Sequence, residues 1–190
     1  MPRKPRLHYA GALYHVISRG NNRQVTFLND GDYQAFLRYV ARVREKKPFI
    51  LYAYCLMPNH FHLLVEVKES PLSVVMQQLL TGYTLYFNRA HGRGGHLFQG
   101  RYKAILCDKN TYLLELVRYI HLNPVRARLG KSPGAWKWSG HGSYLRPGDR
   151  LLSTGPVLAI FSSQAGRARQ AYARFVREGM TLVLRPFKWG

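Results

Sequence analysis

Two histidines one residue apart are the residues of this sequence whose spacing says most about chemistry. His60 and His62 flank Phe61 in a run of apolar residues that is typical of a buried strand. Side chains alternate between the faces of a strand, so both imidazoles point to one face. With oxygen ligands, such a pair suits manganese, magnesium or zinc, and the ligand types do not choose among them. The spacing also fits one histidine in solvent and the other satisfied within the core.

A phenol and an amide oxygen occur together later in the chain. Tyr119 and Asn123 are four residues apart in a segment with helical periodicity, which places them on the same side of a helix. The phenol is a candidate nucleophile, and the amide oxygen is a candidate metal ligand. Two alternatives stay open on spacing alone. Tyr119 also fits the edge of the core, and Asn123 before Pro124 also fits the cap of a new, short helix.

The composition indicates the partner. A chain of 190 residues, 46% of them apolar, can bury the core of one domain with a small appendage. The 29 Lys and Arg against 9 Asp and Glu give a net charge of +20, which attracts polyanions, above all nucleic acid. We expect a cytoplasmic protein, because Cys55 and Cys107 form no disulfide framework and no segment resembles an export signal or a membrane span. Taken with the histidines and Tyr119, this charge predicts an enzyme that cuts DNA through a covalent link to tyrosine.

The hydrophobic pattern predicts an α+β fold. Its elements follow the order strand, helix, strand, strand, helix, strand, which is the ferredoxin-like (split βαβ) arrangement, an antiparallel sheet with helices on one side. A third helix should start at Asn110. We expect residues 1–130 to form the catalytic domain and residues 131–190 a basic, aromatic, helical C-terminal extension packed on it, with a helix from Ser163 to Glu178. The six segments are 13–18, 30–46, 49–56, 61–67, 71–91 and the extended stretch 96–107.

Four motifs carry a resemblance to a known family. The chain resembles the REP-associated tyrosine transposases, which are prokaryotic relatives of the single-tyrosine insertion-sequence transposases with a His-hydrophobic-His (HUH) motif. The match runs from about residue 8 to residue 145 in consistent order. The motifs are residues 15–21 (HVISRGN), 54–64 (YCLMPNHFHLL), 95–102 (GHLFQGRY) and 118–127 (RYIHLNPVRA).

The resemblance implies specific roles. His60, His62 and Asn123 would hold a divalent ion, Mg²⁺ or Mn²⁺, and Tyr119 would be the attacking residue. The family acts on single-stranded or hairpin-forming DNA, such as palindromic repeats, in the prokaryotic cytoplasm at the nucleoid. It leaves a 5′-phosphotyrosine link and a free 3′-hydroxyl, and it can rejoin the ends. Relatives work as homodimers or as monomers, and the sequence does not decide between these states.

Basic and polar residues beside the motifs are the expected DNA contacts. The alternative for residues 19–23 is an ordinary exposed turn, and the alternative for Arg126 is plain solvated charge. Two other functions also stay open: a non-catalytic nucleic-acid-binding module that uses the same sheet, and a metal-dependent nuclease that attacks with activated water. The expected DNA contacts are Arg19, Asn21, Asn22, Arg23, Arg93, Arg101, Lys103 and Arg126.

Overall fold

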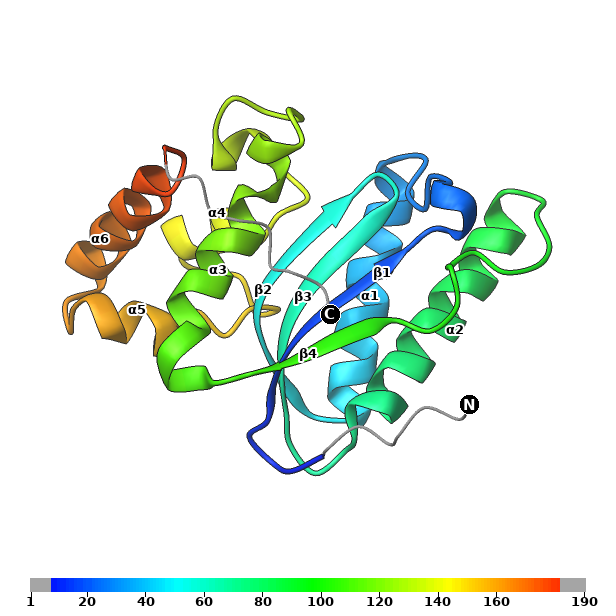
Figure 1. Cartoon of the computed structure of the whole chain (residues 1–190), viewed down its shortest axis with the longest axis horizontal. Helices are drawn as coiled ribbons and strands as arrows, with labels where there is room; N and C mark the ends of the chain where they lie inside the picture. Colours follow the sequence, from blue (N-terminus) through cyan, green and yellow to red (C-terminus); the bar gives the residue numbers. More distant parts are fainter. Residues whose placement is uncertain (1–7, 182–190) are drawn as a thin grey trace.

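A four-stranded antiparallel sheet forms the centre of the molecule (Figure 1). The computed structural model describes residues 8–181. The strands lie in the order β2-β3-β1-β4, so the first strand of the chain is an inner strand and β4 is at an edge. The strands are β1 (Leu13–Arg19), β2 (Phe49–Met57), β3 (His60–Val67) and β4 (Lys103–Cys107).

Two long helices cover one face of this sheet. They are α1 (Asp30–Lys46) and α2 (Leu72–Ala90). Helix α1 begins at a capping box, in which Asn29 accepts from the backbone N–H of Asp32 and Asp32 accepts from that of Asn29. Phe61 of β3 contacts Phe36 of α1, with 4.8 Å between ring centroids. The apolar side chains of the strands and of both helices therefore share one core on this side.

The third helix packs on the other face. Helix α3 (Lys109–Arg126) lies across β2 and β3. Phe61 and His62 are neighbours on β3 and must face opposite sides, so Phe61 enters the core beneath α1 and His62 faces α3. Beyond α3 lie the short elements of the extension (Figure 1). They are η2 (Pro133–Ala135), α4 (His141–Leu145), α5 (Gly155–Phe161) and α6 (Ala165–Glu178).

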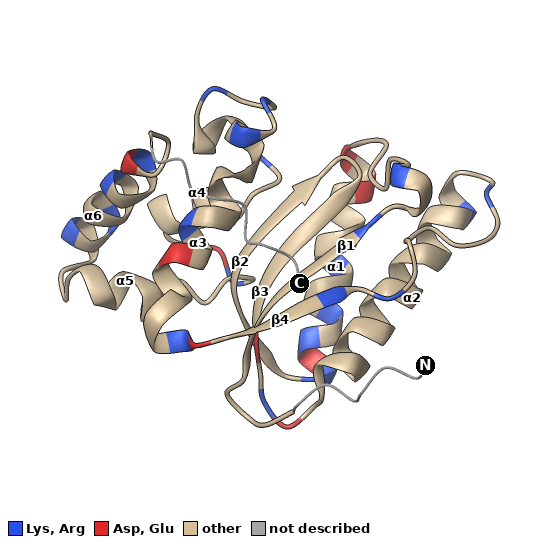
Figure 2. Ribbon diagram, viewed as in Figure 1, with Lys and Arg blue, Asp and Glu red and all other residues tan. Residues whose placement is uncertain are grey.

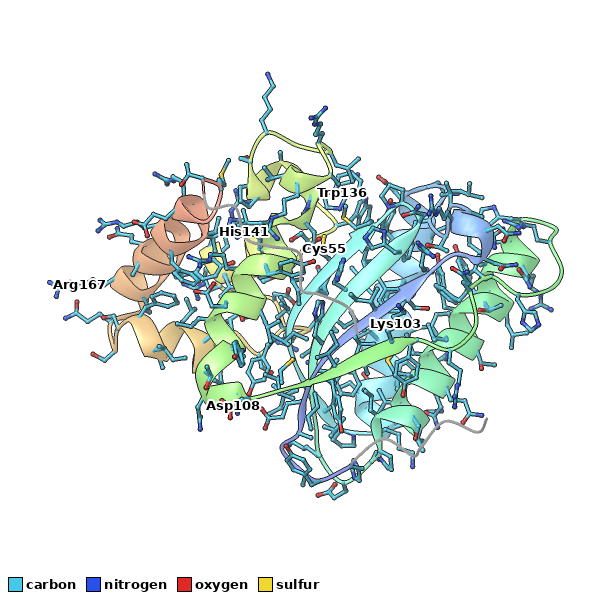
Figure 3. The ribbon with its side chains drawn as sticks, viewed as in Figure 1. Cys55, Lys103, Asp108, Trp136, His141 and Arg167 are labelled. Atoms are coloured by element: carbon cyan, nitrogen blue, oxygen red, sulfur yellow. The ribbon has the colours of Figure 1, made fainter. Side chains whose placement is uncertain are left out.

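A buried tyrosine ties this extension to α3. The hydroxyl of Tyr172, on α6, lies 2.7 Å from Nδ1 of His121 on α3 and 2.9 Å from Nδ1 of His141 on α4. One hydroxyl can donate to one imidazole and accept from the other, so both contacts can form together. Figure 3 labels His141, the first residue of α4. Tyr172 thus connects three helices at one buried point.

The predicted ferredoxin-like arrangement is confirmed, and one prediction about α3 is wrong. No new helix starts at Asn123–Pro124, because α3 continues to Arg126. Pro124 has no N–H to donate to the carbonyl oxygen of Ile120. The side-chain amide of Asn123 instead donates to the carbonyl oxygens of Tyr119, at 2.9 Å, and of Ile120, at 3.4 Å. These bonds partly replace the missing one, so the helix passes through the proline.

Two other boundaries also differ from the expectation. Only Lys103–Cys107 of the stretch 96–107 forms a strand, because Gly100 adopts a φ of +62° and turns the chain before β4. Helix α6 begins at Ala165, one residue later than a cap at Ser163 would place it. The hydroxyl of Ser162 accepts from the backbone N–H of Gln164 in front of the helix. The short helix α5 was not predicted.

Lys and Arg outnumber Asp and Glu along the chain and occur on helices, strands and loops (Figure 2). Within residues 8–181, none of the helices combines the length and the apolar content that crossing a bilayer requires. The N-terminal segment 2–6, which has three basic residues, falls outside the described residues.

Candidate active site

The strand register brings the predicted residues to one face of the sheet. His62 pairs directly with Ile17 on β1, and Ile17 pairs with Lys103 on β4. His60 pairs with Arg19 in the same way. Directly paired residues point to the same side of a sheet, so the imidazoles and two cations from three strands share the face that α3 partly covers. Figure 3 labels Lys103 on the edge strand.

These residues line an open cleft of about 680 Å³ between the sheet, α3 and the segment before β4. Three cationic side chains border it, and no Asp or Glu does, so the cleft carries a positive potential that favours phosphate groups. Its lining residues are Ile17, Ser18, Arg19, His60, His62, Gln99, Gly100, Arg101, Lys103, Tyr119 and Asn123.

His62 is held by a third histidine. Nδ1 of His62 lies 3.0 Å from Nε2 of His15, and the two rings stack with 5.2 Å between centroids. Burial lowers the pKa of His15 to about 4 and holds the pKa of His62 well below its usual value. Both rings are therefore neutral at pH 7, which is the protonation state in which imidazole binds a metal.

His60 is oriented by the residue before it. Its Nδ1 donates to Oδ1 of Asn59 at 2.8 Å, which leaves the lone pair of Nε2 for another partner. Burial, and then the nearby charge of Arg19, lower the pKa of His60. Asn59 therefore fixes the orientation of His60 within the histidine pair.

Tyr119 reaches the same cleft from α3. Its ring meets the ring of His62 edge to face, with 6.1 Å between centroids, and the ring of His15 at 5.8 Å. The side chain is only 8% exposed, and this burial raises the pKa of the phenol. The guanidinium of Arg126 lies over the ring and acts in the opposite direction, because its charge lowers that pKa. The phenol is thus neutral at rest, beside a cation that favours its ionised form.

Asn123 lines the cleft one turn after Tyr119. Its amide nitrogen is used by the two carbonyl oxygens of α3, so its Oδ1 is the end of the amide left to accept or to ligate. Among residues 8–181 no group of three or more His, Cys, Asp and Glu side chains could hold a metal ion. Any metal at this site would therefore rely on two imidazoles and an amide oxygen, which is a weak set of protein ligands.

The expected DNA contacts divide into two groups. Arg19, Arg101 and Lys103 line the cleft, and Arg126 lies beside Tyr119. The other four lie outside the cleft lining. Asn21, Asn22 and Arg23 form the short helix η1 directly after β1, and Arg93 donates to Gln24 near the end of α2.

Sequence reasoning missed two residues of the cleft environment. His15 forms a hydrogen bond with His62, and Gln99 accepts from the guanidinium of Arg19 at 2.8 Å. Both belong to the motifs quoted above, which is the signal that could have identified them. Their partners follow only from the pairing of β1 with β3 and with the segment before β4, and the sequence does not give that register.

The comparisons with known proteins agree with this architecture. The family model described as "Transposase IS200 like" matches residues 8–123. Among solved structures, one titled as a REP-associated tyrosine transposase bound to a REP hairpin has a TM-score of 0.65 at 21% identity, over 80% of this chain and 90% of that one. A protein of Deinococcus radiodurans R1, provisionally assigned as a transposase, has a TM-score of 0.45 at 19% identity, over 63% and 95%. No curated protein matches the sequence. Because the family model spans more than half of the chain, this protein belongs to the IS200-like transposases, with a transposase-like role in binding DNA.

Proposed function

We propose that this protein is a metal-dependent single-strand DNA endonuclease and strand transferase that works through a covalent bond to Tyr119. The observation that carries the proposal is the convergence of Tyr119 with His60 and His62 in one basic cleft. A binding module alone would not need a neutral phenol and two neutral imidazoles at the place where phosphate is attracted.

The chemistry of Tyr119 follows from its surroundings. The phenol oxygen forms a bond to the scissile phosphorus, the bond from phosphorus to the 3′-oxygen breaks, and the phenol proton is lost while the 3′-oxygen gains one. The charge of Arg126 stabilises the phenolate that develops on the way. The product is a 5′-phosphotyrosine with a free 3′-hydroxyl. Because the ester bond is retained, the reverse attack can rejoin strands.

His60, His62 and Asn123 would hold the metal ion, Mg²⁺ or Mn²⁺. The donor set fits, because the Nδ1 atoms of both histidines are already used by neighbours, which leaves each Nε2 for the cleft. Such an ion, when bound, withdraws charge from the phosphate and steadies the leaving oxygen. Three protein ligands without a carboxylate would bind it weakly, and phosphate oxygens of the DNA would add to the ligand set.

Arg19, Arg101 and Lys103 would bind the phosphates on either side of the scissile bond. The substrate we propose is single-stranded DNA that carries a hairpin. Support comes from the similar fold of a protein whose solved structure holds a REP hairpin, and from the net charge of +20. The cleft is open, as a strand that enters and leaves requires.

Substitution of Tyr119 by Phe tests the proposal. Purified protein with a manganese salt is incubated with hairpin oligonucleotides labelled at the 3′ end and resolved on denaturing gels. The wild type should shift the label into a protein–DNA adduct, and Tyr119→Phe should bind the hairpin but form no adduct. Tyr112→Phe is the matched control, because Tyr112 lies on the same helix with its side chain 46% exposed and should react like the wild type.

An adduct that persists in Tyr119→Phe would refute the assignment. Cleavage by the wild type without any adduct would favour the nuclease that uses activated water. Hairpin binding without cleavage under any metal would leave the non-catalytic binding module.

A further inference from the structure

A second, smaller groove lies beside the cleft, between α2 and the segment that precedes β4. Its volume is about 250 Å³. Gly100 lines both cavities, so the groove and the cleft adjoin at this residue. The groove is lined by Leu80, Thr81, Thr84, Leu85, His96, Leu97, Phe98 and Gly100.

The wall formed by α2 has an apolar surface that the fold itself does not use. The buried side of α2 includes Leu79, Tyr83 and Phe87, whereas Leu85 points away from that core and is 66% exposed. Thr81 lies one turn before Leu85, and Thr84 is its direct neighbour. An exposed leucine beside two threonines offers an apolar contact with hydroxyl groups at its edge.

The opposite wall is fixed by hydrogen bonds. The carbonyl oxygen of Leu97 accepts from the backbone N–H of Asn21 at 2.9 Å and from the side chain of Gln24 at 2.9 Å. The N–H of Gln99 donates to the carbonyl oxygen of Arg19 at 2.8 Å. This wall therefore exists before any ligand arrives, which lowers the entropy lost on binding.

The size and chemistry of the groove match a single planar ring. Pockets for drug-sized ligands measure roughly 300–1,000 Å³, and this groove is smaller. A threonine hydroxyl both donates and accepts, as the mixed edge of a nucleobase requires. Leucine offers apolar contact to the face of a base or to the methyl group of thymine. The basic cleft next to the groove would hold the phosphates of the same strand.

We propose that this groove binds one unpaired nucleobase of the DNA strand held in the cleft, and so contributes to the choice of cleavage site. The proposal rests on the proposed function for the presence of DNA in the cleft. Gly100 provides the passage between the two cavities: its φ is +62°, and a Cβ built there meets no atom within 4 Å. The strand can pass over this backbone while its base turns towards Leu85.

The test combines changes in the DNA with changes in the protein. Each unpaired nucleotide beside the hairpin stem is replaced in turn by an abasic site, and affinity is measured by fluorescence anisotropy in a buffer with EDTA. For the wild type, one position should weaken binding about tenfold, whereas its neighbours have smaller effects. In Leu85→Ala and in Thr84→Val, the abasic site at that position should cost little further affinity, since the contact is already lost.

Ile160→Ala is the matched control, because Ile160 is 56% exposed on α5, outside both cavities, and its substitution should leave the profile of the wild type unchanged. Equal sensitivity at every position in the wild type and in Leu85→Ala would overturn the inference. So would an unchanged profile in both variants, which would mean that the sensitive base binds elsewhere on the protein. The Tyr119 adduct assay is a separate measurement. If the wild type forms an adduct but the two variants keep the abasic-site effect, only the groove proposal fails. If the variants lose that effect but no adduct forms, only the covalent mechanism fails.

Discussion

The guanidinium of Arg126 lies over the ring of Tyr119, with 4.8 Å between Cζ and the ring centroid. The two residues are seven apart on α3, and therefore on the same side of the helix. The sequence suggested Arg126 as a phosphate contact. Its position beside the phenol suggests a second task, which is to stabilise the negative charge that develops on the attacking oxygen.

Arg126→Gln should slow adduct formation at neutral pH, because the pKa of Tyr119 rises when the cation is removed. A cation over an aromatic ring is worth ~0.5–1 kcal/mol at exposed sites and about 2 kcal/mol when desolvated, which corresponds to a rate about two- to thirtyfold lower. Single-turnover kinetics measure this, and Arg126→Lys should recover part of the rate. Arg128→Gln is the control for charge alone; an equal loss in that variant would show that Arg126 acts only as general positive charge.

Manganese should bind weakly to the protein and more tightly to the protein with DNA, because the phosphate oxygens complete the ligand set. Electron paramagnetic resonance titrations of Mn²⁺ with and without a hairpin measure both affinities. His60→Ala and His62→Ala should abolish the difference and the cleavage but keep hairpin binding. Tight binding of manganese by His62→Ala in the presence of DNA would contradict the assignment of that ligand.

Asn123→Asp should separate the proposed role of Asn123 as a metal ligand from its hydrogen bonds to the backbone of α3. The carboxylate is a better ligand for Mn²⁺, so metal affinity should rise. The same change removes the amide donor that serves the carbonyl oxygens before Pro124, which should reduce the free energy of unfolding by about 1 kcal/mol. Urea denaturation and manganese titration of one sample test both effects, and Asn123→Ala should lower both quantities.

The contact between His141 and Tyr172 should make the fold sensitive to acid. Burial lowers the pKa of His141 to about 4, against 6.5 for the ordinary imidazole. Because the folded pKa is the lower one, the unfolded chain takes up a proton first, and the contribution of His141 to stability is lost as pH falls from 6.5 towards 4. Between pH 7 and pH 5 the loss is about 2 kcal/mol for this residue.

Urea denaturation of the wild type and of His141→Gln at both pH values measures the contribution of His141 to the pH dependence of the free energy of unfolding. The glutamine keeps a partner for Tyr172 but does not titrate, so the variant should lose about 2 kcal/mol less than the wild type between pH 7 and pH 5. The buried His121, whose pKa is lowered first by burial and then by the charge of His141, is present in both proteins. Identical pH dependences would rule out His141 as a source of acid sensitivity.

Two glycines in helices should respond in opposite ways to alanine. A Cβ on Gly82 would lie 2.7 Å from Cε1 of Tyr39, so Gly82→Ala should push α1 and α2 apart and destabilise the protein by roughly 1–2 kcal/mol. A Cβ on Gly166 meets nothing within 4 Å, and Gly166→Ala should stabilise α6 by about 0.5 kcal/mol. Thermal denaturation of both variants measures the signs, and a stabilised Gly82→Ala would mean that Tyr39 moves at no cost.

The sequence predicted those parts of the fold that depend on local pattern. The order of the elements follows from the periodicity of apolar residues along the chain. The hydrogen bond between His15 and His62 could not be predicted, and neither could the continuation of α3 through Pro124. Each depends on contacts that the hydrophobic pattern does not specify. The extension was harder still, since the five-residue α4 and the seven-residue α5 are too short to show a helical period.

Helix α3 serves both parts of the molecule at once. One side of it carries Tyr119 into the cleft, and the other side packs on α6, where Arg118 stacks on Phe175 with 4.2 Å between Cζ and the ring centroid. The family model ends at residue 123, inside this helix. A chimaera joined after α3 would therefore also have to inherit the outer side of that helix that matches the new C-terminal region, or Tyr119 would lose its alignment in the cleft.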